Sequence, residues 1–188
     1  MQANNLKIQL AKKFDTKNYV IGASLIKQFL WYFTHCLIFR SGIMPVSSVL
    51  VFILKCFGAT IGNHVRIKPY IYIKYPWKLS VGDYTWLAEC YIENLDNVVI
   101  GKNCCISQHA TLMTGNHNYK KTNFDLITKP IYIEDGVWIG ANATVCPGVI
   151  CHTHSVLTMG ALATNSLLAY SIYSGMPAIK IKDRIVEP

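Results

Sequence analysis

Residues 133–168 read IEDGVW-IGANAT-VCPGVI-CHTHSV-LTMGAL-ATNSLL, six units of six residues that follow one another without a gap. An apolar or small residue opens each unit, and a second one follows four positions later. The opening residues are Ile133, Ile139, Val145, Cys151, Leu157 and Ala163, and their partners are Val137, Ala143, Val149, Ser155, Ala161 and Leu167. Such a fixed period indicates a repeat architecture, and it takes precedence over shorter patterns.

The same period returns upstream in shifted frames. The opening residues there are Ile61, Ile67, Ile73, Val81, Leu87, Ile100, Ile106 and Leu112, with the partners Val65, Ile71, Trp77, Thr85, Tyr91, Cys104, Ala110 and Asn116. Glycine stands directly after the opening residue at Gly62, Gly82, Gly101 and Gly140. We expect these glycines to permit a corner geometry that a side chain would resist.

A period of six matches neither the 3.6 of a helix nor the simple alternation of a strand. It fits a short strand followed by a tight corner, with the opening residue and its partner both pointing inward. Three such strands close one triangular coil of about eighteen residues, and successive coils stack at roughly 4.8 Å. The sequence therefore predicts an all-β protein built as a parallel β-helix.

The chain divides into three segments. Residues 1–57 lack the period and form a predicted N-terminal helical cap, residues 58–173 form the β-helix with an extruded loop at 118–130, and residues 174–188 form a tail that packs on the last coils. Two apolar stretches in the cap, 23–40 and 46–57, predict helices. They either cover the open edge of the first coil or lie on a membrane surface with Lys27, Arg40 and Lys55 at the headgroups, and the two roles are compatible.

Composition narrows the classes of function. The 188 residues include 18 Lys and Arg against 10 Asp and Glu, and the formal charge of +8 favours anionic partners. The basic residues are scattered without a nucleic-acid motif, so we expect no nucleic-acid partner. Seven cysteines without a C-x-x-C pair are typical of reduced apolar residues. Because no signal peptide and no run of roughly 20 apolar residues is found, we expect a cytoplasmic protein, or one at the inner face of the membrane.

Several motifs resemble a known family. The segments 114–119 (TGNHNY), 130–141 (PIYIEDGVWIGA), 147–149 (PGV) and 170–178 (YSIYSGMPA) are similar to the hexapeptide-repeat acyltransferases, in particular those of colanic acid and capsule biosynthesis. The resemblance covers residues 58–182. It implies a left-handed β-helix, a handedness that the repeat alone does not give, and a homotrimer with active sites between subunits. It also implies acetyl-CoA-dependent O-acetyl transfer to a sugar hydroxyl in capsular or exopolysaccharide biosynthesis.

The resemblance places the chemistry at one histidine. Acetyl transfer from a thioester to an alcohol needs a base, and histidine, with an ordinary pKa near 6.5, is largely neutral at pH 7. His117 matches the catalytic position of the family, between Asn116 and Asn118 and just before the extruded loop. The implied reaction is direct attack on the thioester, and the chain has no G-x-S-x-G motif that would form an acyl-enzyme.

By the same alignment, the residues expected to bind coenzyme A are Trp138, Ala141, Met159, Gly160, Thr164 and Lys182. The family often has Thr-Lys where this chain has Thr164-Asn165, so one phosphate contact is missing or comes from Lys180, Lys182 or Arg184. The acceptor residues are expected to be Glu93, Asn94, Tyr119 and Asp125, with Asp83, Tyr84, Trp86 and Glu89 on the same side. Aromatic faces beside carboxylates and amides suit a sugar. We expect no metal ligands and no metal requirement.

Three alternatives remain. The acceptor could be another small hydroxyl compound, such as a free sugar or serine. The same fold carries zinc enzymes like the γ-class carbonic anhydrases, which need three converging histidines, and neither His109 with His117 nor His152-x-His154 has that spacing. A non-catalytic scaffold is the third alternative, and the presence of His117 argues against it.

Overall fold

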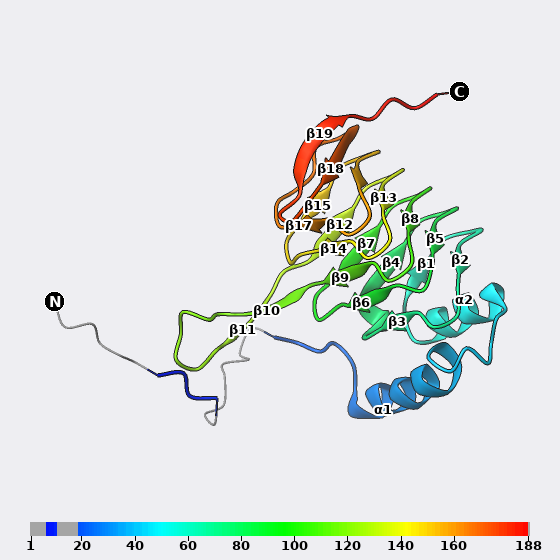
Figure 1. The fold of residues 1–188 in the computed structure, drawn as a ribbon. Coiled ribbons are helices and arrows are strands. Elements are labelled where there is room, and N and C mark those ends of the chain that lie inside the picture. Colours follow the sequence, from blue (N-terminus) through cyan, green and yellow to red (C-terminus); the bar gives the residue numbers. More distant parts are fainter. Residues whose placement is uncertain (1–6, 11–18, 188) are drawn as a thin grey trace.

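The computed structural model describes residues 7–10 and 19–187, and it shows a three-sided prism of short strands with helices at one end (Figure 1). Each side of the prism is one sheet, called sheet A, sheet B or sheet C below. The chain passes through A, B and C in turn within each coil, and about six coils stack along the prism. The predicted parallel β-helix is confirmed.

Sheet A joins β1 (Thr60–Ile61), β4 (Leu79–Val81), β7 (Val98–Ile100), β12 (Ile131–Ile133) and β15 (Ile150–Cys151). Sheet B joins β2 (Arg66–Ile67), β5 (Trp86–Leu87), β8 (Cys105–Ile106), β13 (Trp138–Ile139), β16 (Val156–Leu157), β18 (Ser171–Ser174) and β19 (Ile179–Asp183). Sheet C joins β3 (Tyr72–Ile73), β6 (Tyr91–Glu93), β9 (Thr111–Met113), β14 (Thr144–Val145) and β17 (Leu162–Ala163). A short 3₁₀ turn, η2 (Pro76–Lys78), precedes β4. Neighbouring strands are parallel except for β18 and β19, so each coil is hydrogen-bonded to the next on three sides.

The repeat identifies the inward-facing side chains. All twelve residues that open or complete the units of 133–168 are at most 2% exposed, and the eleven other than Ser155 share one hydrophobic core with the earlier coils. Two upstream partners, Tyr91 and Asn116, are instead exposed. The turn before β6 is one residue shorter than its counterparts, so Cys90 and Ile92 point inward in place of Tyr91. Asn116 has already left the prism in a hairpin.

The glycines that follow the opening residues exclude a side chain, as expected, but not because of their backbone conformation. None of Gly62, Gly82, Gly101 and Gly140 has a positive φ. A Cβ on Gly82 would lie 2.6 Å from the backbone carbon of Gly101 in the next coil, so the requirement is the close approach of two backbones. The cause is therefore contact with the next coil and not the φ of the glycine. A positive φ is found instead at the corner between sheets A and B, called the left-handed corner below. The residues there are His64, Tyr84, Asn103, Gly136, His154 and Tyr170.

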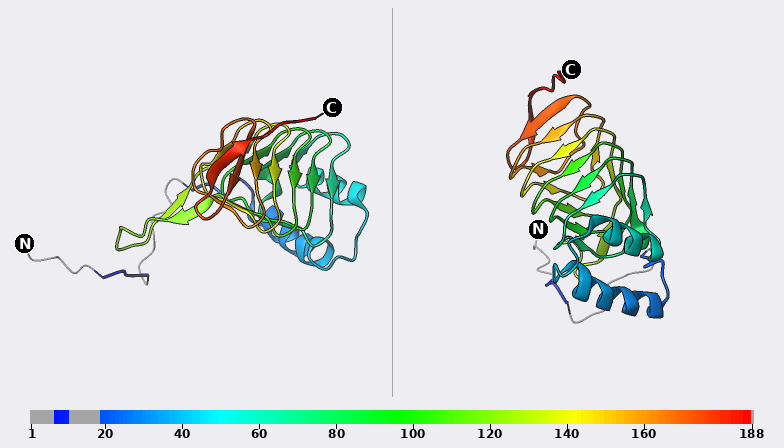
Figure 2. Two further views of the ribbon diagram at one scale, coloured as in Figure 1. Left: turned by 45° about the horizontal axis from the view of Figure 1, so that its top comes forward. Right: turned by 90° about the vertical axis from the view of Figure 1, so that its right-hand side faces the viewer.

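Two helices cover the end of the first coil. α1 (Leu25–Thr34) continues into a π-helical turn, η1 (His35–Phe39), and α2 (Ser47–Cys56) follows. Both lie across the open end of the prism (Figure 2). Their buried side chains Trp31, Phe39, Leu50 and Leu54 belong to the prism core. The indole N–H of Trp31 also donates to the carbonyl oxygen of Ile73 in β3, at 3.1 Å. The helices therefore close an edge that would otherwise be unpaired.

The opposite side of the first helix is apolar as well. α1 and η1 expose Leu25, Ile26, Phe29, Leu30, Tyr32, Phe33 and Leu37, each by 45% or more. At 100° per residue these positions fall on one face, away from the buried Trp31 and His35. This exposed face of α1 and η1 is called the apolar face below. Within the part of the chain that the structure describes, no helix combines the length and apolarity needed to cross a membrane.

The C-terminal segment folds back on the last coils. β19 pairs antiparallel with β18 on sheet B. Beyond it, the guanidinium of Arg184 donates to the carbonyl oxygens of Gly136 and His154, at 2.8 and 3.1 Å. These bonds tie the segment to the left-handed corner of two earlier coils.

Candidate functional site

A hairpin leaves the prism after β9. It consists of β10 (Gly115–His117) and β11 (Leu126–Thr128), and it projects from the side of the solenoid (Figure 1). The N–H of Lys129 donates to the carbonyl oxygen of Thr114 at 2.9 Å and closes the base. A Cβ on Gly115 would lie 2.5 Å from a methyl carbon of Leu95, so the Leu95 side chain packs closely against the base of the hairpin. The loop expected at 118–130 is thus the outer part of an ordered hairpin.

His117 lies at the end of β10 and is half-buried. Its ring stacks on the ring of Phe124, with 4.6 Å between centroids and 11° between planes. Its Nδ1 lies 2.8 Å from the carbonyl oxygen of Phe124. Because a carbonyl only accepts, Nδ1 carries the proton and the lone pair of the neutral ring is on Nε2. The hairpin therefore holds the tautomer in which Nε2 can accept a proton.

Asp125 and Tyr119 lie further out on the same hairpin. The Asp125 carboxylate is buried and forms an ion pair with the Lys121 ammonium at 2.9 Å. The carbonyl oxygen of Asp125 accepts from the N–H of Asn118 at 2.8 Å. Asp125 therefore organises the hairpin that carries His117. The side chain of Tyr119 is 71% exposed at the tip, where a ligand can reach it.

Glu93 lies at the end of β6, one coil before the hairpin. Its carboxylate pairs with the ammonium of Lys74 and accepts from the hydroxyl of Tyr91 at 2.9 Å. The ring of Tyr91 stacks on that of Tyr72, 4.1 Å away. Burial, followed by the charge of Glu93, raises the pKa of Tyr72. The carbonyl oxygen of Glu93 accepts from the hydroxyl of Thr114 at 3.0 Å, which joins this polar cluster to the base of the hairpin.

Asn94 does not face a ligand. Its side chain is fully buried, and its amide makes two bonds to the main chain of Tyr75 in the preceding coil. The N–H of Tyr75 donates to Oδ1 at 2.9 Å, and Nδ2 donates to the carbonyl oxygen of Tyr75 at 2.6 Å. The expectation that Asn94 contacts the acceptor was wrong, because both functions of the amide are used to join two coils.

Four of the residues expected to bind coenzyme A lie together on the later coils. Ala141 and Gly160 stack at the corner between sheets B and C, where the N–H of Gly160 donates to the carbonyl oxygen of Ala141 at 2.9 Å. Met159 beside them is 74% exposed. Trp138 points outward from β13, and its indole N–H donates to the hydroxyl of Ser107 at 2.9 Å. Beyond the adjacent residues of the chain, no atom of the described structure lies within 4 Å of the position that a Cβ on Gly160 would occupy, so this exposed corner has room for a ligand.

The other two lie further away. Thr164 follows β17 at the next corner, and Lys182 lies on β19 beside Ile172. His117 is also separate, because its hairpin leaves the corner that follows sheet C, whereas Ala141 and Gly160 lie at the corner before it. A single chain therefore does not place His117 beside this group.

Two buried cysteines and two further histidines are engaged in the structure of the later coils. Burial raises the pKa of the Cys104 thiol to about 11 and that of Cys151 to about 12, so both are neutral at pH 7. Across the described residues, no group of three His, Cys, Asp or Glu could hold a metal ion. His152 is bonded to Glu134 at 3.0 Å, and His154 stacks on the ring of Tyr170.

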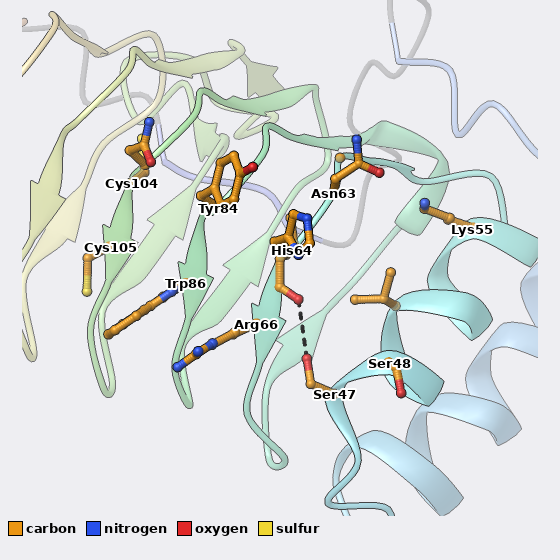
Figure 3. Close-up of a pocket in the computed structure, with 14 residues that line it drawn as sticks. Ser47, Ser48, Lys55, Asn63, His64, Arg66, Tyr84, Trp86, Cys104 and Cys105 are labelled. Atoms are coloured by element: carbon orange, nitrogen blue, oxygen red, sulfur yellow. Dashed lines mark hydrogen bonds between the residues drawn. The ribbon is translucent and has the colours of Figure 1, made fainter.

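A concavity separate from the His117 hairpin lies between α2 and the first three strands of sheet B (Figure 3). Its volume is about 990 Å³, and it is called the sheet B groove below. Lys55 of α2, Arg66 of β2, Trp86 of β5 and the corner residues His64 and Tyr84 line it. The sequence alone did not single out His64 or Arg66, and it pointed to Lys55 only as a cation for lipid headgroups. Lys55 reaches this place only through the packing of α2. Arg66 and Trp86, in contrast, are a cation and an aromatic residue at outward positions of adjacent coils, so their proximity could have been predicted from the repeat.

Comparison with known proteins gives a consistent result. No protein-family model matches the chain. The putative colanic acid biosynthesis acetyltransferase WcaF of Escherichia coli K12 is 33% identical over 165 residues, which span 87% of this chain and 91% of that protein. The galactoside O-acetyltransferase of E. coli K12 is 28% identical over 136 residues, 70% of this chain and 66% of that one.

A solved structure shows the same fold. It is a hexapeptide-repeat-containing acetyltransferase from Vibrio cholerae, complexed with acetyl coenzyme A. It superposes with a TM-score of 0.78 over 93% of this chain and 94% of that chain, at 18% sequence identity. The structural neighbours of the prism are left-handed β-helices, which agrees with the predicted handedness.

Proposed function

The chain belongs to the hexapeptide-repeat acetyltransferases, and on that premise we propose that it transfers an acetyl group from acetyl-CoA to a sugar hydroxyl during capsular or exopolysaccharide biosynthesis. One relative is named for colanic acid biosynthesis and another for a galactoside acceptor, which supports a carbohydrate substrate. The observation that carries the chemistry is the bond from Nδ1 of His117 to the carbonyl oxygen of Phe124.

In the proposed reaction, Nε2 of His117 accepts the proton of the acceptor hydroxyl while the hydroxyl oxygen attacks the thioester carbonyl. The bond to Phe124 keeps Nε2 in its accepting form, and the parallel ring of Phe124 fixes the plane of the imidazole. The carbon–sulfur bond then breaks, and the proton held by His117 is available for the departing thiolate. A positioned base of this kind contributes roughly 10²- to 10⁴-fold to a rate.

The proposed active site lies between subunits of a homotrimer. His117 and the group around Ala141 and Gly160 lie at different corners of one chain, which supports a site completed by a neighbouring copy. A three-sided prism with flat faces suits packing around a threefold axis, which forms three equivalent grooves. Trp138, Ala141, Met159, Gly160, Thr164 and Lys182 are the proposed coenzyme A contacts.

The proposed acceptor site lies beside the hairpin. Glu93 offers a carboxylate whose position is fixed by Lys74 and Tyr91, and Tyr119 offers an exposed ring at the tip. Asp125 acts through the hairpin, since its carboxylate is buried against Lys121. An aromatic ring and an oriented carboxylate are suitable partners for sugar hydroxyls.

The helical end is proposed to contact the inner face of the cytoplasmic membrane. The apolar face exposes seven large side chains with no charge among them. Residues 19–82, which form the helices and the first coil, include seven Lys or Arg and no Asp or Glu. Apolar side chains with a basic surround suit an anionic lipid surface, to which each nearby cation adds about 1 kcal/mol.

The test of the proposed reaction uses the full chain with acetyl-CoA and a panel of galactosides, free sugars and serine. Thiol release and the mass of the acetylated product are followed for the wild type and for His117→Gln and His117→Ala. His152→Gln is the matched control, because His152 bonds to Glu134 at the corner between sheets A and B, away from the His117 hairpin and from the Ala141 corner. We expect kcat to fall roughly 10²- to 10⁴-fold in both His117 variants and to stay unchanged in the control. Equal thiol release from the wild type and His117→Ala would overturn the role of His117.

A further inference from the structure

The sheet B groove contains cations that nothing else in the described chain neutralises. Lys55 and Arg66 both line it, and neither forms an ion pair with any residue that the structure describes. Among the residues that the structure describes, no Asp or Glu lines the groove. Two cations facing one concavity without a carboxylate favour an anionic ligand, and the planar guanidinium of Arg66 suits a phosphate in particular.

The same groove presents aromatic rings. The guanidinium of Arg66 lies over the ring of Trp86, 5.0 Å from its centroid. Tyr84 and His64 stack at 5.0 Å with 11° between their planes. Trp86 and Tyr84 are each more than half exposed, so their surfaces are available to a ligand (Figure 3). Flat aromatic surfaces of this kind stack on nucleobases.

The backbone explains why these groups are fixed in place. His64 and Tyr84 occupy left-handed corner positions, with φ of 56° and 58°, on consecutive coils. Arg66 and Trp86 are directly paired in the parallel register of β2 and β5. Each cation–ring or ring–ring contact is therefore set by the spacing between coils. A concavity of about 990 Å³ is large enough for a ligand with both a base and phosphates.

We propose that the sheet B groove binds a nucleoside diphosphate, bare or as the carrier of a sugar. The phosphates lie between Lys55 and Arg66, and the base stacks on the Trp86 and Tyr84 side. The site is on sheet B beside α2, separate within one chain from the His117 hairpin. It does not depend on the proposed acetyl transfer, and binding is measured without any reaction.

The experiment is calorimetric titration of the full chain with UDP, ADP and GDP in turn, at low ionic strength. We expect at least one of them to bind, and Arg66→Gln and Trp86→Leu each to weaken its Kd about tenfold or more. Both substitutions are at exposed strand positions, and circular dichroism checks that the variants are folded. Lys68→Gln is the matched control, because Lys68 has the same charge on the same coil but does not line the groove. Absence of binding by all three nucleotides, or equal weakening in the control, would overturn the proposal.

Two further titrations identify what is recognised. Uridine tests the base without phosphate and inorganic pyrophosphate tests the phosphates without base. Weaker binding of both than of UDP supports the proposal, whereas pyrophosphate binding as tightly as UDP would overturn the role assigned to the rings. The nucleotide titration is then repeated in the presence of saturating coenzyme A. If coenzyme A displaces the nucleotide and Arg66→Gln weakens both, the groove belongs to the acetyl donor and the proposal fails.

Discussion

The imidazole of His117 and the phenyl ring of Phe124 lie parallel, 4.6 Å apart, and the carbonyl oxygen of Phe124 is 2.8 Å from Nδ1 of the same imidazole. One residue thus holds His117 through both its side chain and its main chain. Phe124 has a φ of 54°, in the left-handed region. Phe124 is therefore a positioning residue.

Replacement of Phe124 separates the two contacts. Phe124→Gly keeps the carbonyl and tolerates the positive φ, while Phe124→Tyr keeps the ring. We expect kcat for thiol release to fall about ten- to hundredfold in Phe124→Gly with the KM for acetyl-CoA unchanged, because the imidazole loses its fixed plane. Phe124→Tyr should stay near the wild type. Equal kcat values for the two variants would show that the ring does not position His117.

The sequence predicts the positions of core residues well and those of surface residues poorly. Inward positions admit only small or apolar residues, so a residue such as Ile139 could be assigned from its period alone. Outward positions follow no such rule, and the meeting of Lys55 with Arg66 depends on how α2 packs. Asn94 shows a further limit. A polar residue beside a corner suggests a ligand contact, and only the structure reveals that its amide is buried against Tyr75.

Asn94 is expected to matter for stability more than for acceptor binding. Asn94→Ala leaves the N–H and the carbonyl oxygen of Tyr75 unpaired in a buried site, and we expect the free energy of unfolding to fall by about 2–4 kcal/mol. Asn97→Ala, at an exposed position of the same turn, is the control. Urea denaturation measures the difference. A normal stability together with a raised acceptor KM in Asn94→Ala would restore the ligand role.

Gly82 tests the close approach of adjacent coils. The methyl group of Gly82→Ala would lie 2.6 Å from the backbone of Gly101, so the two coils must separate. We expect the free energy of unfolding to fall by about 2 kcal/mol. Ser80→Ala, in the same strand β4, should change it little. Equal free energies of unfolding for the two variants would mean that the two coils can separate without loss of stability.

His35 is expected to make stability depend on pH. Burial, and then the charge of Arg40, lowers the pKa of His35 to about 4, below its ordinary value near 6.5. Between these values the unfolded chain binds a proton that the folded protein does not, so the stabilisation is complete above pH 6.5 and is lost as the pH falls toward 4. We expect a loss of roughly 2 kcal/mol across this interval. His35→Gln should lose less over the same interval, and identical pH profiles of the melting temperature would contradict the assignment.

The apolar face predicts binding to anionic membranes. The rings of Phe29 and Phe33 contact one another on the exposed side of α1, with 4.6 Å between centroids and 58° between planes. Their transfer into a lipid interface would remove apolar surface from water. We expect the full chain to sediment with phosphatidylglycerol vesicles much more than with phosphatidylcholine vesicles, and the double variant Phe29→Gln, Phe33→Gln to bind at least tenfold more weakly.

The control for this prediction is at the far end of the prism. Ile185 and Val186 are exposed apolar residues beyond β19, so Ile185→Gln with Val186→Gln removes similar side chains without touching the apolar face (Figure 1). The mass of each variant in solution must also be measured by light scattering. If the Phe29 and Phe33 substitutions dissociate the oligomer while vesicle binding is unchanged, the apolar face is covered by another copy of the chain, and the membrane is not its partner.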